Sequence, residues 1–166
     1  MENISDYIGK ELNWTLVKNV GYVLHAHDEQ SGIAVLQVKG VYGSKAEGKY
    51  GSNIWNFKRA GLLQNNIEIQ EGEHGRQLAL FKRKKLGGIL ETNEGKKFTV
   101  KRNAWFTEYE LLQENDLLIR YVYEQNRPQV FIQQAAENVP ELPWLVLFSG
   151  YLVIMQRIDA SQPFIP

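Results

Sequence analysis

Short segments in which apolar and polar residues alternate follow one another along most of this chain. Between residues 14 and 134 they are separated by turn-forming residues about every ten positions, a spacing typical of an all-β sandwich or barrel. Ile67 and Ile69, for example, alternate with Glu68 and Gln70, so one face of the strand would be buried and the other solvated. The predicted strands cover residues 14–18, 22–26, 33–38, 54–58, 67–70, 78–82, 89–90, 98–101, 105–111, 117–123 and 129–134, and the glycine-rich stretch 41–52 is predicted to be the longest loop.

The last quarter of the chain contains an uncharged run, LPWLVLFSGYLVIM, at residues 142–155. A helix that is apolar on every side has no face for water, so it must be buried in protein or in a membrane. The run is shorter than the roughly 20 apolar residues that span a bilayer, and runs of about 10–14 more often form buried helices. We therefore predict a buried helix over about residues 140–157, with a membrane anchor as the alternative.

A β-rich chain that ends in such a helix needs an enclosed place for it. The helix could cross an open sheet, but it would then need a polar outer stripe, which this run lacks. Alternatively the sheet closes, and about eleven or more strands leave room for a central helix. The sequence thus predicts a mainly β fold, a closed antiparallel barrel of about 12 strands around a C-terminal hydrophobic α-helix. Trp55, Trp105 and Trp144 are expected in its core, with Trp14 near its rim.

Composition limits the possible functions. The 166 residues fit one domain without a shift in composition, so residues 1–166 are predicted to form a single barrel. The chain has no cysteine, which excludes disulfides, a thiolate nucleophile and cysteine-ligated metal and is compatible with a reducing cytoplasm. Its start lacks the pattern of a secretion signal, and no nucleophile elbow, phosphate-binding glycine loop or zinc motif is present. We expect a non-enzymatic protein, cytoplasmic or peripheral at a membrane, with no catalytic residue, cofactor, metal or nucleic-acid partner.

Positive charge is concentrated in one segment, although the net charge of the chain is zero. Residues 82–102 contain eight basic and two acidic residues, a net +6 that the rest of the chain balances. Basic clusters attract anionic lipid surfaces at about 1 kcal/mol per lysine or arginine, whereas many charge runs are ordinary solvated surface. The candidate residues for binding an anionic lipid are Lys82, Arg83, Lys84, Lys85, Lys97, Lys101 and Arg102.

The arrangement of this segment can also be predicted. Lys97 and Lys101 should share the outward face of one strand, because residues two apart in a strand point the same way. Sequential antiparallel strands usually pair, so Glu108 and Glu110 on the next strand are expected opposite these lysines. The cluster 82–85 is expected close to the same strand, where it would remain free for a ligand.

Four segments carry a resemblance to a known superfamily. They are IWNFKR (54–59), LALFKRKKLGG (78–88), EGKKFTVKR (94–102) and the terminal PWLVLFSGYLVIMQR (143–157). In their order and in the closing helix the chain resembles the tubby C-terminal-like domains, which include phospholipid scramblases and LURP-one-related proteins. The resemblance implies a twelve-stranded barrel around a C-terminal helix. It also implies binding of phosphoinositide head groups or association with membranes, and it assigns no individual ligand residue here.

Three functions follow as expectations. The leading one is a module that binds an anionic membrane surface or lipid head group. The alternative is an intracellular interaction or scaffold barrel with a protein partner, which an exposed apolar patch would favour. A carrier of a small ligand comes third and would require a deep polar pocket.

Overall fold

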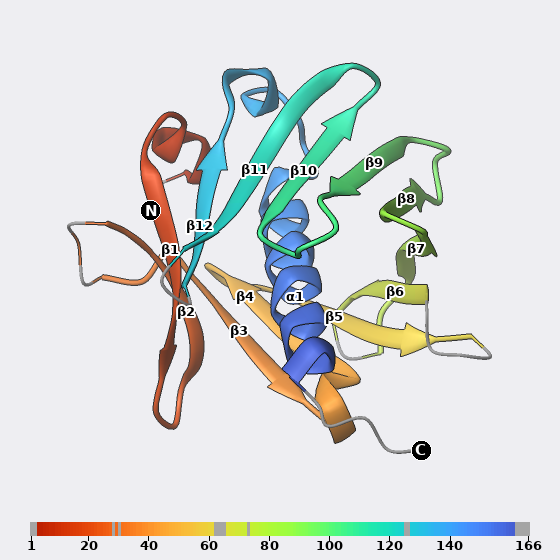
Figure 1. The fold of residues 1–166 in the computed structure, drawn as a ribbon, viewed down its shortest axis with the longest axis horizontal. Helices are drawn as coiled ribbons and strands as arrows, with labels where there is room; N and C mark the ends of the chain where they lie inside the picture. Colours follow the sequence, from red (N-terminus) through yellow and green to blue (C-terminus); the bar gives the residue numbers. More distant parts are fainter. Residues whose placement is uncertain are drawn as a thin grey trace.

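The structure is a computed structural model that describes residues 3–27, 29, 31–61, 66–72, 74–124 and 127–161, with Ser161 described only in its backbone. The strands are β1 (Glu11–Val17), β2 (Gly21–Ala26), β3 (Ala34–Lys39), β4 (Lys45–Tyr50), β5 (Asn53–Ala60), β6 (Asn66–Glu71), β7 (Gln77–Lys84), β8 (Gly87–Thr92), β9 (Lys97–Arg102), β10 (Glu108–Gln113), β11 (Asp116–Glu124) and β12 (Arg127–Ile132). Three 3-10 turns, η1 (Ile4–Tyr7), η2 (Val41–Gly43) and η3 (Gln134–Ala136), and one helix, α1 (Leu142–Ser161), complete the described chain (Figure 1).

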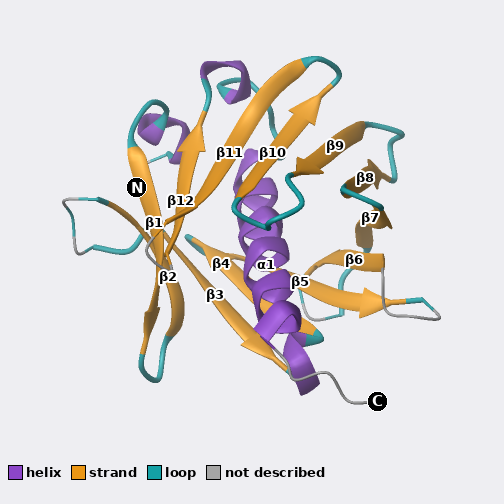
Figure 2. Cartoon of the chain, viewed as in Figure 1, coloured by secondary structure: helices purple, strands orange, loops and turns teal. Residues whose placement is uncertain are grey.

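The twelve strands form a closed antiparallel barrel. Each strand pairs with the next one along the chain, and β12 returns to pair with β1, which leaves no free edge in the sheet. The helix α1 runs through the middle, with β1 and β12 on one side of it and β5 on the other (Figure 2). The predicted fold is therefore confirmed. Its physical basis is the all-round apolar helix, which the barrel wall surrounds.

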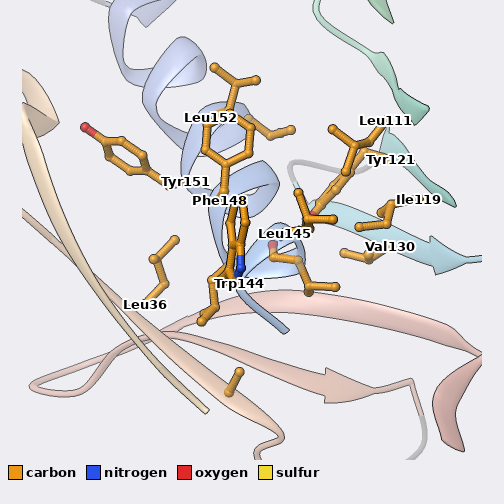
Figure 3. Close-up of a cluster of buried hydrophobic side chains, with 14 of the residues drawn as sticks. Leu36, Leu111, Ile119, Tyr121, Val130, Trp144, Leu145, Phe148, Tyr151 and Leu152 are labelled. Carbon is orange, nitrogen blue, oxygen red and sulfur yellow. Dashed lines mark hydrogen bonds between the residues drawn. The ribbon is translucent and has the colours of Figure 1, made fainter. Parts of the chain in front are cut away.

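The helix provides much of the core. All residues from Trp144 to Gln156 are buried. Their side chains contact opposite walls of the barrel: Leu36 of β3 lies on one side of the helix, and Ile119 and Val130 lie on the other (Figure 3). A lumen filled in this way has no room for a large internal ligand, so ligand binding must occur at the ends or on the outer face.

Buried tyrosines attach the helix to the wall. The Tyr121 hydroxyl donates to the carbonyl of Val146 at 3.1 Å and accepts from the Ser149 hydroxyl at 2.9 Å. The Tyr109 hydroxyl donates to Oε1 of Gln156 at 2.6 Å. Burial raises the pKa of Tyr109 and of Tyr121 to about 12, because the phenolate would lose its hydration inside the barrel.

Two glycines allow close approach between helix and wall. A Cβ on Gly150 of α1 would lie 2.8 Å from the indole of Trp14, and one on Gly48 of β4 would lie 3.0 Å from Leu147. Gly48 belongs to the stretch 41–52 that was predicted to be a loop. That prediction was wrong, because this stretch contains η2 and β4. Gly48 leaves space for the helix rather than marking a turn.

The remaining differences are local. The strand predicted at 105–111 begins only at Glu108, and Trp105 precedes it in a turn, where it is 79% exposed instead of lying in the core. Trp14, expected near the rim, is only 1% exposed. The helix continues to Ser161, four residues beyond its predicted end. The predicted burial of Trp55 and Trp144 is confirmed.

Candidate functional site

The antiparallel topology places alternate strand connections at the same end of the barrel. The connections β1–β2, β3–β4, β5–β6, β7–β8, β9–β10 and β11–β12 therefore share one end. The C-terminal part of α1 reaches this end: the Tyr151 hydroxyl donates to the carbonyl of Gly43 at 2.6 Å, and Asp159 forms a bidentate pair with Arg59 at 3.1 Å. The other connections, and the start of α1, lie at the opposite end.

The two ends differ in charge. Among the described residues that bound or form the connections, the first end carries seven basic residues against two acidic ones, a net +5. These are Lys18, Lys39, Lys45, Lys84, Lys85, Arg102 and Arg127, with Glu108 and Glu124. We call this set the basic end. The opposite end carries three basic residues against five acidic ones, a net −2: Arg76, Lys96 and Lys97, with Glu29, Glu71, Glu94, Glu114 and Asp116. We call it the acidic end.

The positive charges of the basic end outnumber the negative ones and are not taken up in ion pairs among the described residues. None of its seven basic residues forms an ion pair within the described chain. At the acidic end, by contrast, Lys96 lies 2.5 Å from Glu141, whose hydrogen bond raises the pKa of the lysine. The C-terminal end of a helix carries partial negative charge, so the end of α1 stabilises nearby cations without forming ion pairs with them. The field there remains positive and faces solvent.

The predicted basic segment is divided between these ends. Lys84 lies at the basic end, and Lys101 lies beside it, next to Arg102. Gly87 of β8 is the backbone partner of both lysines, so β8 separates β7 from β9, which were expected to lie closer together. Lys97 starts β9 at the acidic end, about 13 Å from Lys101 at the rise of a β-strand. Lys82 is also exposed, nearer the middle of β7. The clusters 82–85 and 101–102 are therefore the part that the structure brings together.

The predicted acidic neighbours are confirmed only in part. Glu110 is the backbone partner of Lys101, as expected. Glu108 has no lysine opposite it and instead lies 3.7 Å from Arg120 of β11. Phe98 and Val100 are buried, so Lys97 and Lys101 do share the outward face of β9.

Three arginines at this end, Arg83, Arg102 and Arg157, are only partly exposed. The charges of Arg102, Arg157 and Arg83 all act on the phenol of Tyr109, although burial outweighs them in setting its pKa. Arg102 stacks 4.0 Å from the ring centroid of Phe106, and its Nη2 donates to the carbonyl of Lys85 at 3.3 Å. Its Nε is buried without a hydrogen-bond partner, and burial lowers the pKa of this arginine.

A hollow of about 580 Å³ opens beside the C-terminal part of α1. Apolar and aromatic side chains line it, including Tyr22, Tyr123 and Ile154, and Arg127 and Arg157 lie at its edge. Arg157 stacks 3.9 Å from the ring centroid of Tyr123. Within the described residues no cluster of histidine, cysteine, aspartate and glutamate is suited to a metal ion. This end of the barrel therefore offers positive charge and apolar surface to a partner.

Sequence reasoning missed several residues of the basic end. Lys18, Lys39, Lys45 and Arg127 are far from the segment 82–102 in sequence and come together with it only through closure of the barrel. The available signal was that turns alternate between two ends. With the strand order known, lysine or arginine lies in or bounds five of the six connections at this end, all except β5–β6.

Comparison with known proteins gives no identity: no family model, no curated protein and no solved structure matches this chain. Among the described helices, none is both long enough and apolar enough to cross a bilayer.

Proposed function

We propose that this chain is a non-enzymatic domain that binds anionic membrane surfaces through the basic end of its barrel. The observation that carries the proposal is the separation of charge, net +5 at one end against −2 at the other among the described residues. A chain of zero net charge can concentrate anions at one surface in this way, since a partner responds to the local field. Anionic lipids, phosphoinositides among them, are partners that such a field attracts without demanding a fixed geometry.

The resemblance to the tubby C-terminal-like domains supports the same class of partner. Membership of that superfamily stays a prediction. The sequence segments that suggested it include the β7–β8 turn, which bears Lys84 and Lys85, and the end of β9, which bears Arg102. Within the described residues these cations form no ion pair, which favours the proposal over plain solvated surface, where charges of both signs are commonly interspersed.

Vesicle co-sedimentation with a matched pair of variants tests the proposal. Lys84→Gln/Lys85→Gln removes two charges from the basic end, whereas Lys10→Gln/Lys97→Gln removes two exposed charges at or beside the acidic end. At about 1 kcal/mol per lysine, the first pair should weaken binding to vesicles containing phosphatidylserine by about 2 kcal/mol, roughly 30-fold. The second pair should leave binding almost unchanged.

Salt and lipid composition provide the controls. Binding should weaken as salt rises, because exposed charges are screened beyond about 10 Å at 0.1 M ionic strength. Vesicles that contain phosphoinositide should show whether the head group matters beyond its charge. Equal recovery on neutral and anionic vesicles, or equal losses for the two double variants, would contradict the proposal. Stoichiometric capture of one protein partner without lipid binding would favour the scaffold alternative.

A further inference from the structure

The exposed apolar side chains of the barrel are concentrated at the basic end. Within the described chain, eight large hydrophobic residues are exposed, and seven lie in the connections or adjoining strand ends of the basic end: Leu16, Val17, Val20, Val41, Tyr42, Leu86 and Trp105. The eighth, Ile54, lies at the start of β5, at the other end. We call the seven residues the apolar tips.

Each apolar tip is close in sequence to a cation. Lys18 lies inside the β1–β2 turn with Val20, and Arg102 ends the strand before Trp105. Lys39 and Lys45 bound the β3–β4 connection that carries Val41 and Tyr42, and Lys85 precedes Leu86. Four separate hairpins therefore repeat one combination, an exposed apolar side chain beside a basic side chain that forms no ion pair with another described residue.

Two of these connections contain an aromatic residue with positive φ. Phe106 has φ +59°, a value that is unfavourable for a bulky residue, and its ring lies beneath the guanidinium of Arg102. The neighbouring Trp105 is left 79% exposed. Tyr42, with φ +53°, is likewise half exposed in the β3–β4 connection.

We infer that the apolar tips insert into the interface of the bilayer that the basic end approaches, so that the barrel docks end-on. The inference rests on the proposed function and adds the mode of contact to it. A bilayer is favoured over a folded protein partner because tryptophan and tyrosine prefer the membrane–water boundary and lysine and arginine pair with its anionic head groups. A bilayer can also take up apolar tips from several separate hairpins, because it does not require the shape complementarity of a protein interface.

Tryptophan fluorescence provides the test. The chain has four tryptophans, of which Trp14, Trp55 and Trp144 are buried, so Trp105 alone can reach lipid. The protein is mixed with phosphatidylcholine–phosphatidylserine vesicles in which part of the phosphatidylcholine carries bromine in its upper acyl chains. Quenching is expected for the wild type and should be lost in Trp105→Phe, which keeps the three buried indoles.

Affinity measurements complete the experiment. Trp105→Ala should weaken binding to these vesicles roughly tenfold, the effect of removing one large inserted side chain, whereas Ile54→Ala should leave it unchanged. Binding to anionic vesicles with equal quenching in wild type and Trp105→Phe would overturn the insertion but leave the proposed function intact. Absence of vesicle binding would overturn both. A dimer in solution that depends on Trp105 would also overturn the insertion, because the tips would then serve a second copy of the chain.

Discussion

Phe148 lies at the centre of α1, and its replacement measures how much of the fold depends on the enclosed helix. The side chain is 0% exposed, and its ring centroid lies 5.3 Å from that of Phe81 and 6.4 Å from that of Phe57. Phe148→Ala removes this burial and leaves a cavity, a change that typically costs about 3–5 kcal/mol. We expect a loss near 4–5 kcal/mol, because both aromatic contacts disappear and a closed wall cannot easily collapse into the space.

Urea unfolding followed by far-ultraviolet circular dichroism is the assay, with Trp105→Ala as the control. Both substitutions remove a large aromatic side chain, but that of Trp105 is 79% exposed, so its loss should change the free energy of unfolding by no more than about 0.5 kcal/mol. The shift in midpoint at constant m-value gives the comparison. Similar losses for the two variants, or a loss below about 1.5 kcal/mol for Phe148→Ala, would refute the packing of α1 inside the barrel.

Two further predictions concern the stability of the barrel. Tyr109 and Tyr121, with pKa values raised to about 12, should stay protonated in the folded state while the unfolded chain ionises near pH 10. The free energy of unfolding should therefore be highest below pH 10 and fall by about 1.4 kcal/mol per pH unit for each tyrosine between about pH 10 and 12. Ultraviolet absorbance would follow the ionisation, and urea unfolding at each pH would give the free energy. A constant free energy of unfolding over this range would contradict the buried phenols. Gly88→Ala places a Cβ 2.4 Å from the ring of Phe81 and from the carbonyl oxygen of Lys82. Such overpacking costs about 1–3 kcal/mol and should lower the melting temperature by roughly 2–12 °C; an unchanged value would contradict the packing of β8 on β7.

The fold could be predicted because its strongest signals are local. Alternation identified most strands, and the uncharged run at 142–155 required enclosure whatever the details of the sheet. The failures have a common cause. Gly48 in β4 suggests a turn in the sequence, because the helix that packs on it lies far along the chain. Trp105 continues the apolar alternation of β10 but precedes that strand.

The candidate site was harder to predict, because it depends on closure and direction. A charge run in sequence suggests one patch, yet β9 carries Lys97 to one end of the barrel and Lys101 to the other. The pairing of β1 with β12 is what places Lys18 and Arg127 at the same end of the barrel as the segment 82–102. Alternation predicts which face of a strand a residue occupies. Predicting the end of the barrel at which it lies requires the full order of the strands.

The orientation of the bound barrel is the most direct test of the account. The chain has no cysteine, so Ala104→Cys at the basic end and Asn115→Cys at the acidic end each provide one labelling site, on the connections that flank β10. Strands of about six residues separate the ends by about 20 Å. With a donor dye on the cysteine and an acceptor on the lipid head groups of phosphatidylserine vesicles, we predict more energy transfer from residue 104 than from residue 115. Equal transfer, or more from residue 115, would contradict binding through the basic end.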